Sequence, residues 1–121
     1  MAASVLFLEY PKCSTCQKAK KWLDEHGVAY DVRHIVEDNP TADELQAWHG
    51  RSGLPLKRFF NTSGMLYREM GLSKKLPAMS EADQYELLAT NGMLVKRPLL
   101  VTDAAVVPGF KEAVWADALG V

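Results

Sequence analysis

The sequence predicts an α/β fold in which a βαβ unit and a ββα unit flank a run of short helices. Three observations support this prediction. An apolar run, an amphipathic segment and a second apolar run follow one another within residues 1–36. Short segments of helical character, separated by glycines, fill the middle of the chain. Two short apolar runs and a last amphipathic segment occupy residues 94–121.

The first strand is expected over Ser4–Glu9, an apolar run that a Tyr-Pro dipeptide ends. A helix is expected to begin at Cys13 or Ser14 and to end before Gly27. Its inward face repeats at spacings of three and four residues, with Ala19, Trp22, Leu23 and His26. A second strand over Ala29–Ile35 completes a βαβ unit, whose two strands should be parallel.

The middle of the chain is expected to be helical. Thr41 and Glu44, three residues apart, form a capping-box pattern, and the helix that they start is expected to stop at Gly50. Three further short helices are expected, the last of them capped by Ser80: Pro55–Phe60, Gly64–Met70 and Ser80–Thr90.

The end of the chain returns to strand and helix. Leu94–Thr102 contains a strand that Pro98 can begin but not interrupt, and Val106 and Val107 form a short strand after it. A terminal helix is expected over Phe110–Leu119. This order is that of a thioredoxin-like sheet with a helical insert. We therefore expect one domain over residues 1–121, with thioredoxin-like parts at about 1–36 and 94–121 and an insert at about 40–92.

Composition excludes several classes of function. The formal net charge is -1, which gives no electrostatic reason to expect direct binding to nucleic acid or to an anionic membrane. The N-terminal apolar run has no basic flank and is too short for a signal peptide or a membrane span. We therefore expect a soluble, cytoplasmic protein.

The two cysteines, Cys13 and Cys16, carry the clearest chemical signal. They are three positions apart where the first strand is followed by the first helix. A thiol at a helix N-terminus faces unpaired N–H groups and the positive end of the helix dipole, which favour the thiolate, and Lys12 could add to that effect. Cys16, one turn later, could attack a mixed disulfide formed on Cys13 and release the product.

Two alternatives compete with this interpretation. Cys16 could be a small buried apolar residue without a chemical role. The pair could also supply two ligands to zinc, but zinc needs two more, and the three histidines show no paired spacing. We therefore expect no metal.

A second motif is Lys96-Arg97-Pro98, directly before the third strand. In a thioredoxin-like fold, a proline at this place lies beside the dithiol, and we expect the Arg97–Pro98 peptide bond to be cis. Arg97 would then present a planar cation to an anion or a thiolate. The alternative is an exposed arginine beside a proline that starts a strand.

These motifs resemble the arsenate reductase (ArsC) and Spx family, closest to its arsenate-reductase-like branch. The resemblance rests on the segments 10–19, 56–64, 96–99 and 109–112, and it covers nearly the whole chain. It implies a thioredoxin-like fold with a helical insert, a nucleophile at Cys13 and an anion-binding arginine at Arg97.

The resemblance also implies two specific functions, and the chain departs from both. Arsenate reductases that use glutathione and glutaredoxin surround the oxyanion with three arginines, whereas Asn61 and the region of Lys111 stand near the two companion positions here. They also lack a cysteine at the position of Cys16. Spx-type regulators have the cysteine pair and bind the C-terminal domain of the RNA polymerase α subunit partly through a glycine, for which Gly53 is the nearest match. Here Lys57 and Arg58 follow that glycine, whereas the regulators have acidic residues in this stretch.

Three hypotheses follow. The first is a thiol–disulfide oxidoreductase that uses Cys13, Cys16 and Arg97 on a disulfide or a small oxidised substrate. It would have no bound cofactor, and a glutathione/glutaredoxin or thioredoxin system would donate its electrons. The second is an arsenate reductase, with Lys12, Asn61, Pro98 and Lys111 around the anion. The third is a redox-sensing partner of RNA polymerase.

Overall fold

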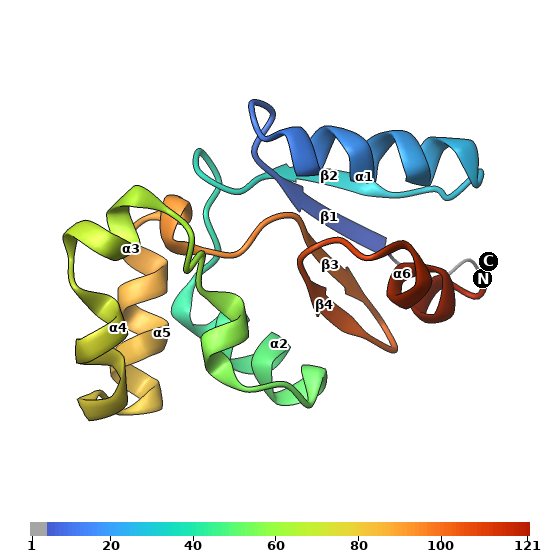
Figure 1. Cartoon of the computed structure of the whole chain (residues 1–121). Coiled ribbons are helices and arrows are strands. Elements are labelled where there is room, and N and C mark those ends of the chain that lie inside the picture. The colour runs from blue at the N-terminus through green and yellow to red at the C-terminus, as the bar shows by residue number, and fades with distance from the viewer. Residues whose placement is uncertain (1–4) are drawn as a thin grey trace. The chain divides into compact units, whose positions relative to one another are not determined.

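A mixed four-stranded sheet organises the part of the chain formed by residues 5–34 and Arg97–Val121 (Figure 1). This computed structural model describes residues 5–121, so Ser4, where the first strand was expected to begin, lies outside the described residues. The strands are β1 (Val5–Glu9), β2 (Asp31–His34), β3 (Leu99–Thr102) and β4 (Val106–Pro108), in the order β2-β1-β3-β4. β1 and β2 are parallel, which confirms the βαβ prediction, and β3 is antiparallel to both of its neighbours.

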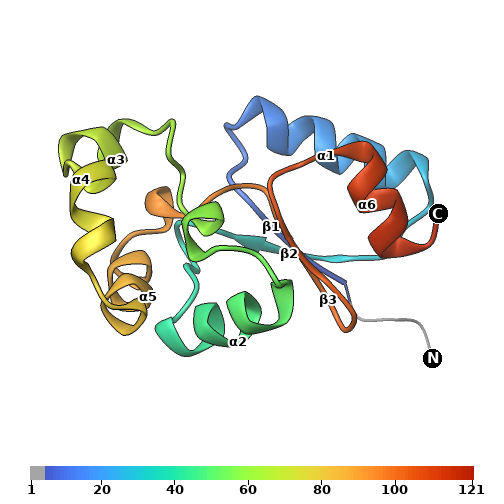
Figure 2. The same cartoon turned by 60° about the horizontal axis from the view of Figure 1, so that its bottom comes forward.

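Two helices, α1 (Ser14–Glu25) and α6 (Glu112–Leu119), cover one face of this sheet. Figure 2 shows them on the same side of the strands. Their apolar residues join those of β1 and β3 in one core, in which the ring of Phe7 meets that of Trp115 edge to face at 6.0 Å. The buried members of this core are Val5, Phe7, Ala19, Trp22, Leu23, Leu100 and Trp115. The fold is therefore the thioredoxin-like α/β fold that the sequence predicts.

Strand β1 determines what lies beneath the start of α1. Successive side chains of a strand point to opposite faces, so Val5, Phe7 and Glu9 share one face of the sheet. Val5 and Phe7 pack against the helices, and Glu9 continues the same row at the carboxyl end of the strand. A carboxylate thus follows two core residues on the face that α1 covers.

The second compact unit, Ile35–Lys96, is helical. Its helices, of which three are short 3₁₀ turns (η), are α2 (Ala42–Ser52), η1 (Leu56–Phe59), α3 (Met65–Glu69), α4 (Leu72–Lys75), η2 (Leu76–Ala78), α5 (Glu81–Thr90) and η3 (Gly92–Leu94). The capping box of Thr41 and Glu44 forms as expected, with bonds of 3.0 and 3.1 Å, and Ser80 caps α5. Among residues 5–121, no helix is long and apolar enough to cross a membrane.

The structure corrects the prediction that the helix after Thr41 stops at Gly50. The helix α2 continues to Ser52, because the left-handed backbone that ends it belongs to Gly53, with a φ of 69°. A glycine inside a helix costs only about 1 kcal/mol, which the capping box and the buried residues of α2 offset.

Two further differences concern short elements. The second strand is shorter than expected, Asp31–His34 rather than Ala29–Ile35, and α4 was not predicted from the sequence. The spacing of Leu72 and Leu76, both buried and four residues apart, was the helical signal for this segment.

Candidate active site

The loop between β1 and α1 positions Cys13 at the start of a helix. Cys13 is the N-cap residue of α1, with an extended backbone (φ −83°, ψ 123°), and its carbonyl accepts the N–H of Gln17 at 3.0 Å. Its own N–H donates to the carbonyl of Tyr10 at 2.9 Å, and the Gln17 side chain donates to the carbonyl of Pro11 at 2.9 Å. These bonds hold the loop against the helix, so the Cys13 thiol lies at the unpaired N–H groups of the first turn.

The surroundings of Cys13 favour its thiolate. Partial burial by itself raises the pKa of this thiol. Against it act the backbone N–H and the thiol of Cys16 and the backbone N–H of Thr15, which donate to the sulfur. The positive charge of Arg97 acts in the same direction. The net effect lowers the pKa of Cys13 below its ordinary value, which gives this half-buried thiol nucleophilic character near neutral pH.

Cys16 has the opposite character. Its side chain is buried, and burial is the main reason why its pKa rises to about 12. The N–H of Tyr10 donates to its sulfur at 3.5 Å and acts in the opposite direction, lowering the pKa. Its bond to the Cys13 sulfur and the negative charges of Cys13 and Glu9 raise the pKa further. The pair thus consists of one activated thiol and one thiol that keeps its proton.

Arg97 and Pro98 approach this pair from the start of β3. The Arg97–Pro98 peptide bond is cis, as expected from the sequence. The Arg97 guanidinium lies over the ring of Tyr10, with Cζ 5.2 Å from the ring centroid, and its Nε is buried. Pro98 is buried, and its carbonyl accepts the N–H of Gly109 at 2.8 Å. The stacking on Tyr10 places a cation beside the residue whose carbonyl anchors Cys13.

Glu9 and Tyr10 belong to this site, although neither was predicted from the sequence to have a role in it. Glu9 is only 6% exposed, and its charge raises the pKa of both Cys16 and Tyr30. An acidic residue in phase with two core residues of an apolar strand was the signal that pointed to it. Tyr10 carries the backbone donor to Cys16 and the ring beneath Arg97.

The other expected site residues are more scattered. Lys12 is exposed and is not among the groups that shift the pKa of Cys13. Lys111 is exposed at the N-cap of α6. Asn61 and Gly53 belong to the second unit, where the N–H of Asn61 donates to the Leu94 carbonyl at 2.8 Å and Gly53 ends α2. Within residues 5–121, no three His, Cys, Asp or Glu side chains gather in a group that could hold a metal ion.

Sequence comparisons extend over nearly the whole chain. The model of the ArsC family matches residues 8–118. The protein YusI of Bacillus subtilis is 57% identical over 109 residues, which are 90% of this chain and 92% of YusI. The regulatory protein MgsR of the same organism is 27% identical and covers 91% of this chain and 86% of its own length. The global transcriptional regulator Spx of Staphylococcus epidermidis is 26% identical over 84% of this chain and 76% of its own.

Solved structures agree with these relatives. A protein from Bacteroides fragilis, described as related to the ArsC family, superposes with a TM-score of 0.93 at 60% identity and covers 97% of this chain and 98% of its own. A possible arsenate reductase from Streptococcus mutans superposes with a TM-score of 0.84 at 47% identity, over 90% of this chain and 92% of its own.

Proposed function

The chain belongs to the ArsC family, and from that premise we propose that it is a thiol–disulfide oxidoreductase that works through Cys13 and Cys16. The observation that carries the proposal is the asymmetry of the two thiols. Cys13 has a lowered pKa at the start of α1, whereas Cys16, one turn later, is buried with a pKa of about 12. Such a pair separates the tasks of attack and release.

In the first step, the Cys13 thiolate attacks one sulfur of a substrate disulfide. A bond forms between the Cys13 sulfur and that sulfur, the substrate S–S bond breaks, and the departing thiolate takes up a proton from water. In the second step, Cys16 attacks the Cys13 sulfur, so that the Cys13–Cys16 disulfide forms and the bond between Cys13 and the substrate sulfur breaks. The proton that Cys16 loses is taken up by the departing second substrate thiolate. One substrate disulfide is reduced and the two cysteines are oxidised. A thiol donor of the glutathione/glutaredoxin or thioredoxin type would then return the pair to the dithiol.

The first step prepares Cys16 for the second. The hydrogen bond to the Cys13 sulfur and the negative charge of Cys13 both raise the pKa of Cys16. A mixed disulfide on Cys13 carries no charge, so both effects weaken as soon as the first bond has formed. The resolving thiol therefore becomes easier to ionise only when there is something to resolve.

The test follows thiol consumption by the reduced protein with oxidised glutathione, a disulfide-bonded protein or arsenate. We expect oxidation of both cysteines with a disulfide substrate, and Cys16→Ser should accumulate a mixed disulfide on Cys13 that mass spectrometry detects. Ser14→Ala, an exposed change between the two cysteines, is the matched control and should react like the parent. Undiminished reaction of Cys13→Ser would refute the proposal.

Of the three substrates, we expect arsenate to give the slowest turnover. Arsenate carries close to two negative charges near neutral pH, and its reduction beside a thiolate needs several positioned donors. Arg97 supplies one planar cation, while Lys111 and Asn61 would have to stand in for two others. Without two such cations the anion loses about 1.5–3 kcal/mol for each missing charge-assisted contact. Brisk turnover at low arsenate would favour the arsenate reductase function.

A redox-sensing regulator is the second candidate, favoured by the similarity to MgsR and Spx. In that function Cys13 and Cys16 would be a switch without turnover, and Gly53 would belong to the contact with the C-terminal domain of the RNA polymerase α subunit. A pull-down with that domain, using the oxidised and reduced protein, distinguishes it. Binding that depends on the oxidation state, together with no turnover of any substrate, would favour the regulator.

A further inference from the structure

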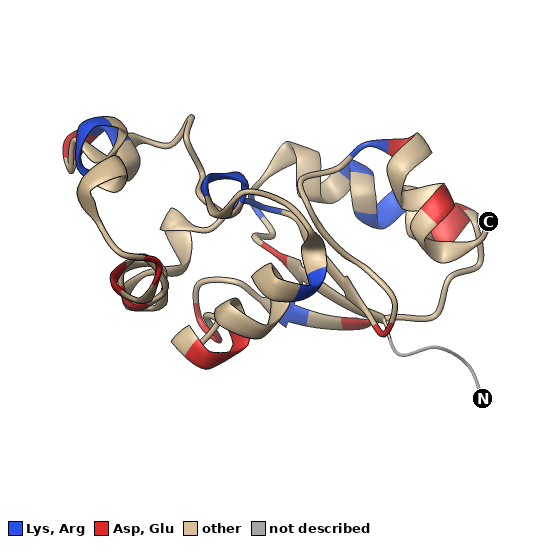
Figure 3. Ribbon diagram, turned by 90° about the horizontal axis from the view of Figure 1, so that it is seen from below, with Lys and Arg blue, Asp and Glu red and all other residues tan. Residues whose placement is uncertain are grey.

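The turn after α2 and the segment before β3 enclose a hollow of about 280 Å³ in the second unit. Its lining contains three basic residues and a hydroxyl, and none of its members is acidic: Pro55, Lys57, Arg58, Phe60, Thr62 and Lys96. The chain as a whole has 14 basic and 15 acidic residues, so a hollow with three cations and no acid departs from its overall balance. In Figure 3, Lys and Arg (blue) and Asp and Glu (red) occur in several separate segments of the ribbon.

Backbone hydrogen bonds hold the two segments together. The N–H of Lys96 donates to the Phe59 carbonyl at 2.8 Å, and the N–H of Asn61 donates to the Leu94 carbonyl at 2.8 Å. Between these bonds, Phe60 and Val95 form an antiparallel bridge. The turn is itself closed by the bond from the Arg58 N–H to the Pro55 carbonyl at 3.0 Å. The hollow is therefore built on a fixed backbone rather than on two independent loops.

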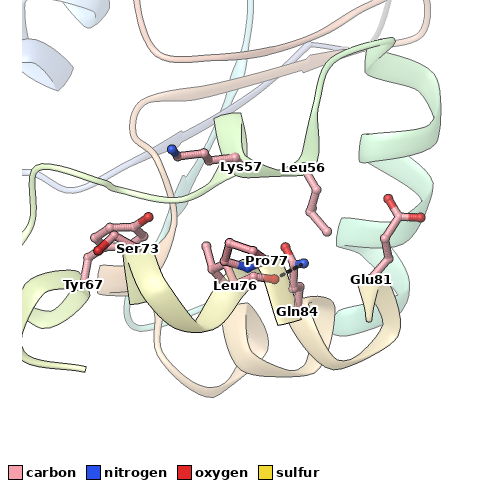
Figure 4. A pocket seen from close by; sticks show the side chains of 8 residues that line it. All are labelled: Leu56, Lys57, Tyr67, Ser73, Leu76, Pro77, Glu81 and Gln84. Atoms are coloured by element: carbon pink, nitrogen blue, oxygen red, sulfur yellow. Dashed lines mark hydrogen bonds between the residues drawn. The ribbon is translucent and has the colours of Figure 1, made fainter. Parts of the chain in front are cut away.

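The three cations are not neutralised within the unit. In the described part of the chain, Lys57, Arg58 and Lys96 take part in no ion pair. Glu81 is a carboxylate that must be considered, because it lines a second pocket, of about 270 Å³, together with Lys57. Figure 4 shows the amino group of Lys57 pointing away from the Glu81 carboxylate. Three like charges around one hollow repel one another until an anion joins them.

We propose that this hollow binds the phosphate group of a small organic molecule with two to three negative charges. The guanidinium of Arg58 offers the planar pair of donors that suits phosphate oxygens, Lys57 and Lys96 add point charges, and the Thr62 hydroxyl adds a neutral donor. Pro55 and Phe60 provide apolar surface for the rest of the ligand. The limited volume favours a small molecule over an extended acidic segment of a protein. The hollow consists of residues to which the proposed cysteine chemistry gives no role, and the inference does not depend on the proposed function.

The test is a titration of the reduced protein with pyrophosphate, followed by the amide resonances of residues 57–62 and 96 and by calorimetry at physiological ionic strength. We expect saturable binding with shifts confined to these residues. Arg58→Gln and Lys96→Gln should each weaken it about tenfold, the usual contribution of one charge-assisted contact. Lys74→Gln, which removes an exposed cation of the same unit outside the hollow, is the matched control and should leave the affinity unchanged.

Three results would overturn the proposal. One is the absence of saturable shifts at millimolar pyrophosphate. Another is equal weakening by Lys74→Gln, which would mean unspecific attraction to the basic surface. The last is tighter binding of an unphosphorylated acidic peptide, which would assign the hollow to a protein partner. Circular dichroism of Arg58→Gln and Lys96→Gln shows whether the variants remain folded. The test measures binding alone, so it does not depend on activity toward a disulfide.

Discussion

Substitution of Gly92 by alanine is a direct test of the packing within the helical insert. A Cβ atom on Gly92 would lie 1.8 Å from the carbonyl oxygen of Ile35 and 2.7 Å from its carbonyl carbon. Both obstacles are backbone atoms, and Ile35 is fully buried, so no flexible side chain can move aside. The chain at the start of the insert and the chain at its end must therefore separate by more than an ångström.

The expected cost follows from this geometry. Overpacking of a close-packed interior costs about 1–3 kcal/mol, and a clash between two backbones belongs at the upper end or beyond it. We expect Gly92→Ala to lower the free energy of unfolding by about 3 kcal/mol, a large part of the 5–15 kcal/mol typical of domains. Gly50→Ala is the matched control. Gly50 lies inside α2 with no atom within 4 Å of the new Cβ, so alanine should stabilise the helix by about 0.5–1 kcal/mol.

Urea unfolding followed by circular dichroism measures both variants. The two changes add the same methyl group, so the sign of the difference depends on the surroundings alone. Equal stability of Gly92→Ala and the parent would refute the close approach of Ile35 to Gly92. A destabilised Gly50→Ala would refute the view that α2 continues through this glycine.

Further predictions concern the ionisation of the thiols. Arg97→Gln should raise the pKa of Cys13 and slow its alkylation at neutral pH, whereas Arg97→Lys should retain part of the effect. An unchanged pH profile of alkylation would show that the charge does not act on the thiol. Glu9→Gln should lower the pKa of Cys16, because a negative charge that raises it is gone, and the ultraviolet absorbance of the thiolate follows this. The pKa of Cys16 is about 12 in the folded protein and has its ordinary value in the unfolded chain. The contribution of Cys16 to the free energy of unfolding is therefore fully present below the ordinary cysteine pKa and decreases above it, by about 1.4 kcal/mol per pH unit. Reduced Cys16→Ala should lack this decrease in urea titrations, and parallel curves for parent and variant would contradict the burial of the thiol.

Local signals made most of the fold predictable from the sequence. Thr41 and Ser80 cap their helices as the pattern indicates, and the apolar run before Cys13 forms a strand. These features depend on residues within a few positions of one another. The end of α2 was misplaced because Gly50 and Gly53 look equivalent in sequence, and only the backbone conformation distinguishes them.

The residues of the site could be predicted from the sequence, but the difference in pKa between its two thiols could not. Cys13 and Cys16 stand out by their spacing, and Arg97 by its place before a strand. The high pKa of Cys16 on α1 depends mainly on burial, and the negative charge of Glu9 on β1 adds a smaller contribution. Such effects join residues on different elements, and no spacing in the sequence reveals them.

The close approach of Ile35 and Gly92 also affects the order in which the chain can fold. Strands β1 and β3 pair Leu8 with Leu99, so the sheet must close a loop of about 90 residues. Once the segment from Ile35 to Gly92 has folded, its two ends touch, and the loop that remains is roughly a third as long. The entropic cost of closure then falls by about 1 kcal/mol. An insert that folds first would thus bring the two parts of the sheet closer together along the chain before they pair.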